Sequence, residues 1–153
     1  MANFPTSKTS QPLAGCPRAA GFTLIEVMIV VVILGILSSL AFPAYTDYIR
    51  RGRVTDAVAQ LAEFNLRMEQ ASQDNGNYGV ETCAVPVPAQ TSYFKTTCEL
   101  GENGQSYVAT ATGQAAMAGH TYTIDDAGTK QTTAFIRPVQ LPASCWLLSE
   151  GDC

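Results

Sequence analysis

The sequence contains few of the residues on which most enzyme chemistry depends. Among its 153 residues there is one histidine, His120, and there is no phosphate-binding loop, C-x-x-C pair or Ser–His–Asp set. His120 lies between Gly119 and Thr121 and is expected in a loop. As the one histidine of the chain it is not expected to bind a metal, because a metal site needs several ligands. The sequence therefore predicts no catalytic residue, no metal and no cofactor, and we expect the protein not to be an enzyme.

Charge is also scarce, and positive charge is the scarcer kind. Charged residues make up 14% of the chain, with 9 Lys or Arg against 13 Asp or Glu and a net charge of −4. This balance argues against a general nucleic-acid binder, whose affinity would depend on neutralising phosphates. The densest basic cluster is Arg50, Arg51 and Arg53.

Charge is absent altogether from Val27 to Thr46, a run of twenty residues. As a helix, this run is long enough to span the hydrocarbon core of a bilayer. One carboxylate, Glu26, lies just inside the apolar segment, where it costs a few kcal/mol if left unpaired. A carboxylate buried among apolar helices must be neutralised or paired, so we expect Glu26 to have a function.

The string from Gly21 to Tyr45, GFTLIEVMIVVVILGILSSLAFPAY, resembles the N-terminal signature of type IV prepilins. The resemblance implies that a prepilin peptidase cuts between Gly21 and Phe22 and methylates the new amine of Phe22. It also implies that Glu26 pairs with the N-terminal amine of a neighbouring subunit, or of its own chain, in a filament core. Elementary geometry supports that pairing, because Phe22 and Glu26 are four residues apart and lie on one face of a helix.

The chain divides into a leader (1–21), the spanning and filament-core half of a long helix (22–53), and a head domain (54–153). The predicted helix runs from about Leu24 to Asp74, is expected to kink at Pro43, and ends at Asn75-Gly76. Beyond the spanning segment, apolar residues recur at steps of three or four, which predicts an amphipathic helix with one face covered by a sheet. These residues are Val54, Ala57, Val58, Leu61, Phe64, Met68 and Ala71.

The C-terminal half has the pattern of a small antiparallel sheet. The segment from Asn77 to about Gln105 is interrupted by Pro and Gly and is predicted to be a loop. Alternation predicts strands at Ser106–Thr112, Thr121–Ile124 and Gln131–Ile136, the last two joined by a turn at Asp125–Gly128. Paired aspartates beside a glycine are expected to form that turn rather than a catalytic or calcium site. The fold class is α+β, and the resemblance implies the type IV pilin fold.

Cysteine usage suits an exported domain. Five cysteines become four if Cys16 leaves with the leader, and an even number suggests disulfides. Of three possible pairings we favour Cys83 with Cys98 and Cys145 with Cys153, which join positions close in sequence and do not cross. Cys16 ends a lipobox-like run, but the polar leader lacks the apolar region that lipid attachment requires. Trp146, beside Cys145, is expected to pack on an edge of the sheet.

The resemblance implies a type IV pilus subunit that waits in the inner membrane and is polymerised into an extracellular filament. Its implied partners are other pilin subunits, the prepilin peptidase and the pilus assembly platform. The implied uses are adhesion, twitching motility or DNA uptake, and the Ala/Thr/Gly-rich sheet region resembles minor pilins of the E-like type.

Three alternatives stay open. A type II secretion pseudopilin shares the N-terminal signature, although the C-terminal cysteines favour a pilin. A competence minor pilin that binds DNA would require Lys95, Lys130 and Arg137 to form one exposed stripe. A simple anchored domain would show neither cleavage nor any effect of Glu26→Ala on polymer formation.

Overall fold

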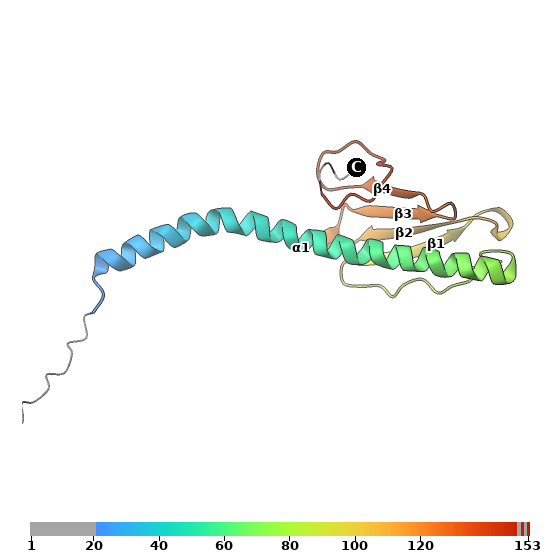
Figure 1. Ribbon diagram of the computed structural model, residues 1–153, viewed down its shortest axis with the longest axis horizontal. Coiled ribbons are helices and arrows are strands. Elements are labelled where there is room, and N and C mark those ends of the chain that lie inside the picture. The colour runs from blue at the N-terminus through green and yellow to red at the C-terminus, as the bar shows by residue number, and fades with distance from the viewer. Residues whose placement is uncertain (1–20, 150, 152) are drawn as a thin grey trace, which may run out of the picture. The chain divides into compact units, whose positions relative to one another are not determined.

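The structure is a computed structural model that describes residues 21–149, 151 and 153. The predicted leader, apart from Gly21, lies outside the described residues, as do Cys16 and its lipobox-like run. The chain forms two compact units that divide after Leu40, and Figure 1 shows the elements of each. The first unit contributes residues 21–40 to the description, and the second comprises residues 41–153.

One helix, α1 (Leu24–Asn75), accounts for a third of the chain and confirms the predicted helix at both ends. It begins with a capping box: the amide of Glu26 donates to Thr23 Oγ1 at 3.3 Å, and the amide of Thr23 donates to Glu26 Oε2 at 2.9 Å. It ends at Gly76, which has a φ of +76° and donates its amide to the carbonyl of Ser72 at 2.8 Å. The helix is continuous through Pro43, whose missing N–H leaves one helical bond unmade.

The apolar stripe of the second half of α1 forms the core of the second unit, as its spacing predicts. Six of the seven predicted positions are buried, with Leu61 and Met68 fully so, and Ala71 is half-buried. Phe64 meets the ring of Tyr107 edge-on at 6.2 Å between centroids. The Asn65 side-chain amide donates to the Tyr107 hydroxyl at 2.7 Å, and burial raises the pKa of that hydroxyl to about 12.

Four antiparallel strands in the order β1-β2-β3-β4 form the sheet, and α1 packs across it (Figure 1). The strands are β1 (Phe94–Leu100), β2 (Tyr107–Gly113), β3 (Thr121–Asp125) and β4 (Lys130–Ala134). The sequence predicted β2, β3 and β4 within one or two residues. The turn between β3 and β4 also forms as predicted: Asp125 Oδ1 accepts from the Thr129 amide at 2.7 Å, and Gly128 has a φ of +73°.

The prediction of a loop over Asn77–Gln105 is wrong for β1. All seven residues of β1 pair with β2, from Phe94 opposite Gly113 to Leu100 opposite Tyr107. The inward face of β1 consists of Phe94, Thr96, Cys98 and Leu100, which alternate with exposed Lys95, Thr97 and Glu99. Only the two ends of this face are large and apolar, so the alternation is weak in the sequence. Cys98 is also bonded to Cys83, and the pairing with β2 makes this weak pattern a regular strand.

Candidate assembly surfaces

The first unit exposes nearly all of its apolar side chains. From Phe22 to Phe42 the large apolar residues are 50–88% exposed, and α1 is long and apolar enough to cross a membrane, with a mean hydropathy of 2.7 in its best window. Soluble monomers rarely expose a continuous apolar surface of this kind, which marks contact with a membrane or with other proteins. We call residues 22–42 the apolar arm.

Glu26 is the one charge on the apolar arm. Its Oε2 accepts from the amide of Thr23 at 2.9 Å and from the Thr23 hydroxyl at 3.0 Å, and no ion pair among the described residues includes it. Glu26 borders one shallow hollow together with Phe22 and Val30. The carboxylate therefore lies beside the predicted cleavage site and caps its helix, while its charge has no cationic partner within the described chain.

Asp47, in the second unit, is the centre of an ion-pair cluster on α1. Arg137 Nη2 lies 2.5 Å from Asp47 Oδ2, and Arg50 Nη2 lies 3.2 Å from Asp47 Oδ1. The Arg53 guanidinium lies 3.9 Å from the centroid of the Tyr93 ring. No local pattern predicts the contact between Asp47 and Arg137, which are ninety residues apart. These contacts tie α1 to the segment after β4 and to the segment before β1.

His120 lies in the loop directly before β3, as predicted, but its side chain is buried, with 1% exposed. Its Nδ1 lies 3.3 Å from the Tyr122 hydroxyl and its ring meets Phe135 edge-on at 4.9 Å. Its Nε2 has no hydrogen-bond partner among residues 21–149, 151 and 153. Burial, and then the positive charge of Arg50, lower the pKa of His120 below its ordinary value. Among the described residues, no group of three or more His, Cys, Asp or Glu could hold a metal ion.

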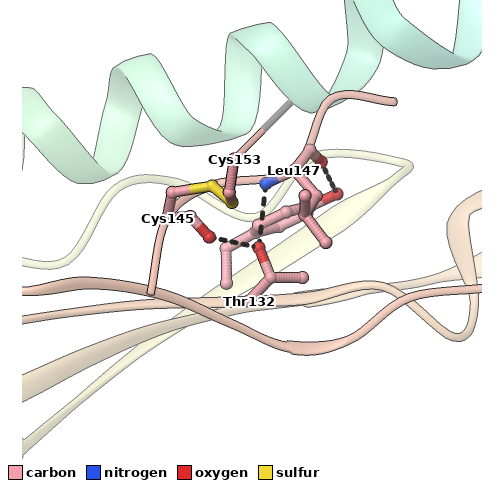
Figure 2. Close-up of a disulfide and its surroundings, with 5 residues drawn as sticks. Thr132, Cys145, Leu147 and Cys153 are labelled. Carbon is pink, nitrogen blue, oxygen red and sulfur yellow. Dashed lines mark hydrogen bonds between the residues drawn. A yellow bond between two sulfur atoms is a disulfide. The ribbon is translucent and has the colours of Figure 1, made fainter. Parts of the chain in front are cut away.

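The C-terminal tail is fastened to β4 by Thr132, which is completely buried. Figure 2 shows the contacts: Thr132 Oγ1 donates to the carbonyl of Cys145 at 2.7 Å and accepts from the amide of Leu147 at 2.9 Å. The Trp146 indole donates to the carbonyl of Thr123 at 2.9 Å, so Trp146 packs on the sheet as predicted. Cys145 is bonded to Cys153, with their Cα atoms 6.1 Å apart. Sequence reasoning did not identify Thr132, since a threonine within a strand carries no distinguishing signal.

The second disulfide joins the loop after α1 to the sheet. Cys83 is bonded to Cys98 on β1, with their Cα atoms 6.3 Å apart. Both disulfides therefore have the pairing that proximity in the sequence favours. Each disulfide closes a loop of the chain and thereby lowers the conformational entropy of the unfolded state.

The three cations of the proposed DNA-binding stripe lie apart. Lys95 is exposed on β1, opposite Thr112 of β2. Lys130 begins β4, which is separated from β1 by β2 and β3, and its Nζ lies 4.9 Å from the centroid of the Trp146 ring. Arg137 contacts Asp47 on α1. The structure therefore does not bring these residues together on one stripe.

Family models match two successive parts of the chain. Residues 16–42 match the model described as a prokaryotic N-terminal methylation motif. Residues 43–128, more than half of the chain, match the model described as "Type IV minor pilin ComP, DNA uptake sequence receptor". The boundary between the two matches lies at Pro43, at the end of the apolar arm.

Curated relatives are similar over about a third to just over half of the chain. The chain is 35% identical over 81 residues to "Prepilin peptidase-dependent protein D" of Escherichia coli, covering 50% of this chain and 54% of that protein. It is 38% identical over 91 residues to a "Fimbrial protein" of Pseudomonas aeruginosa, covering 58% and 56%. It is 50% identical over 54 residues to "Type IV major fimbrial protein FimA" of Dichelobacter nodosus, covering 35% and 34%. The chain thus spans about half the length of the first of these relatives.

A type IV pilin structure from Shewanella oneidensis aligns with a TM-score of 0.47 and 19% identity, covering 53% of this chain and 89% of that one. The exposed apolar arm, the helix that continues into an α+β unit, and the two family matches lead to one conclusion. The chain belongs to the type IV pilin family, and within it to the group that the ComP minor-pilin model describes.

Proposed function

We propose that the protein is a structural subunit of a type IV pilus. Prepilin peptidase removes the leader between Gly21 and Phe22, the apolar arm holds the subunit in the inner membrane, and an assembly platform moves it into a surface filament. The observation that carries this proposal is the exposed apolar arm with its single carboxylate, Glu26. A structural role of this kind requires no catalytic group.

The physical argument concerns where the apolar arm finds a suitable environment. Burying one Val, Leu or Ile side chain contributes about 1.5–3 kcal/mol relative to water, so the apolar arm cannot stay exposed to water. Lipid and a bundle of other arms both satisfy it, because lipid tails are as apolar as these side chains. Moving from membrane to filament therefore gains little from the hydrophobic effect, and specific pairing must decide which subunits join and in what register.

Glu26 supplies such a pairing. Cleavage before Phe22 creates a positive amine four residues before Glu26, and in an apolar filament core each charge needs the other. Because α1 begins at Leu24, Phe22 does not lie on the helix with Glu26 as the spacing predicted, so the amine of a neighbouring subunit is the partner that this proposal favours. A neighbour placed out of register would leave both charges unpaired, at a cost of several kcal/mol. The capping box with Thr23 is a separate role, because it needs hydrogen-bond acceptors but no charge.

The substitution Glu26→Gln separates the two roles. Glutamine can still complete the capping box but carries no charge. We expect both Glu26→Gln and Glu26→Ala to abolish filaments recovered by shearing, while the chains stay in the membrane. If Glu26→Gln assembles as the wild type does, the carboxylate serves the helix cap alone and the pairing is wrong.

Intact mass spectrometry of sheared surface filaments and of membranes tests processing and assembly together. The proposal expects a chain that begins at N-methylated Phe22, is four hydrogens lighter for two disulfides, and is abundant in the sheared fraction. The same processed mass confined to membranes, or present in traces in filaments, would point to a minor pilin or a pseudopilin. An uncut chain would refute the proposal.

A second candidate function is DNA binding during DNA uptake, which is favoured by the match of residues 43–128 to a model described as a DNA uptake sequence receptor. The net charge of −4 and the separation of Lys95, Lys130 and Arg137 do not favour broad phosphate contact. A receptor here would have to read a defined sequence through few contacts. Duplex binding by the purified full-length chain tests this, because a receptor retains one duplex over its scrambled counterpart and a filament subunit alone retains neither.

A further inference from the structure

The charged side chains of the second unit separate towards its two ends. We call the end where α1 finishes and the β1–β2 and β3–β4 turns lie the tip, and the end where β2 leads to β3 the base (Figure 1). Acidic side chains at the tip include Glu69, Asp74, Glu81, Glu99, Glu102 and Asp126. The cations at the base that lie on α1 or contact it are Arg50, Arg51, Arg53 and Arg137. The exceptions are Asp47 and Asp56 on α1 at the base and Lys130, which begins β4 near the tip. Cations still outnumber carboxylates at the base, and carboxylates outnumber cations at the tip.

The tip is a rigid surface. The amide of Tyr78 donates to the carbonyl of Gly104 at 2.8 Å, and a side chain at Gly104 would collide with the carbonyl of Gly79, 1.9 Å from its Cβ. The Tyr78 hydroxyl donates to the Glu69 carboxylate at 3.0 Å. These contacts hold the loop after α1 against the β1–β2 turn. Within the described residues, no ion pair reaches a carboxylate of the tip.

Val80 projects from this rigid loop. It is 87% exposed, among the most exposed large apolar side chains of the described chain, and exposed Glu81 follows it directly. Cys83, three residues further on, is bonded to Cys98, which fixes the far side of the loop to β1. The tip therefore presents an apolar side chain beside a carboxylate, held by a loop that needs little ordering to bind a partner.

The base contains a groove with the complementary properties. A hollow of about 430 Å³ lies between α1 and the segments around it, lined by Tyr45, Ile49, Arg53, Ala116, Met117 and Ile136. Tyr45 is 65% exposed and Ile136 is 59% exposed, so the groove offers apolar surface to a partner. Arg50 also lines it, and the buried Nε of Arg50 has no hydrogen-bond partner within the described residues. Thr46 and Asp47 complete the lining, and Asp47 pairs with Arg50, so the rim carries two arginines against one carboxylate. The groove is therefore apolar inside and has a net positive rim.

We propose that the tip of one subunit docks in the base groove of a second copy of this chain. Val80 enters the apolar groove, and Glu81 with Glu102 faces Arg50 and Arg53. This inference rests on the proposed pilus function and identifies a contact between the heads. Because the two surfaces differ, the contact is heterologous and repeats into an open filament rather than closing into a dimer. Opposite charges at the rim favour this register and oppose tip-to-tip association.

Cysteine crosslinking in assembled filaments tests the contact directly. The variant Val80→Cys with Ala116→Cys places one thiol at the tip and one in the groove, while the four head cysteines are already in disulfides. With a bismaleimide crosslinker we expect a ladder of dimers, trimers and longer species from sheared filaments in denaturing gels. Each single variant should stop at a dimer at most. Filaments of the double variant that give no ladder would overturn the docking.

A charge exchange keeps the inference testable if the cysteine variant fails to assemble. Arg53→Glu and Glu81→Arg should each lower the sheared filament yield at least about tenfold, because like charges then meet at every contact. The two changes together should restore most of the yield. Lys95→Glu is the matched control, since Lys95 is an exposed cation on β1 outside the groove, and its yield should stay near that of the wild type.

The outcomes separate this inference from the proposed function. Wild-type filaments combined with unchanged yields in both single reversals would overturn the docking and leave the pilus function standing. A wild-type chain that never enters filaments would overturn both. Loss of yield in Arg53→Glu that Glu81→Arg does not restore would also contradict the contact, because the change would then act within one head.

Discussion

Replacing Thr132 by valine removes one hydroxyl from the buried junction between β4 and the C-terminal tail. Valine has the same shape, and the backbone pair between Thr132 and Ala143, with both bonds at 3.0 Å, stays intact. The hydroxyl itself makes two bonds, to the carbonyl of Cys145 at 2.7 Å and to the amide of Leu147 at 2.9 Å (Figure 2). Both are lost, and nothing of similar geometry replaces them.

The expected cost follows from the burial of the stranded groups. Leu147 is 4% exposed, so its amide cannot turn to water, and an unsatisfied buried donor costs about 1–3 kcal/mol. Cys145 is half-buried, so its carbonyl recovers part of its hydration and adds about 1 kcal/mol. We expect Thr132→Val to lower the free energy of unfolding by about 2–4 kcal/mol in total, which corresponds to a fall in Tm on the order of 10 °C for a domain of this size.

Urea unfolding of the full-length chain in detergent measures this effect. Trp146 is the only tryptophan, so its fluorescence reports on the tail, while far-UV circular dichroism reports on the helix and sheet. Thr133→Val is the matched control, because Thr133 is exposed and makes one long contact of 3.5 Å to the Thr121 carbonyl. If Thr132→Val and Thr133→Val unfold within about 0.5 kcal/mol of each other, the assigned role of the Thr132 hydroxyl is wrong.

Two further perturbations test the head. Replacing Cys83 and Cys98 together by serine opens a loop of 15 residues and should lower the free energy of unfolding by about 3 kcal/mol, measured by urea titration against the wild type; an unchanged midpoint would contradict this. His120 has a folded pKa below its unfolded value of about 6.5, so the unfolded chain binds the proton first and stability should fall as pH drops below 6.5. His120→Leu should remove that part of the fall in Tm between pH 7.5 and pH 5, and an identical fall in both proteins would show that other groups cause it.

Local sequence patterns were sufficient for most of the fold. The helix from Leu24 to Asn75 follows from an uncharged run, then a stripe at helical spacing, then a glycine that can adopt positive φ. The β3–β4 hairpin follows from alternation on both sides of a turn that contains Asp125 and Gly128. β1 was missed, because its inward face of Phe94, Thr96, Cys98 and Leu100 has polar or small residues in the middle and follows a segment rich in proline.

Some of the candidate sites consist of residues close together in the chain, and others join distant segments. The apolar arm, the position of Glu26, the predicted cleavage site and the resemblance to pilins can all be read from the amino-acid sequence, because each depends on residues close to one another in the chain. The contact of Arg137 with Asp47, the Thr132 junction and the groove beside Ile136 join segments far apart in the chain. These contacts become visible in the folded chain alone, because strand order and the packing of α1 determine which distant side chains meet, and no local pattern encodes either.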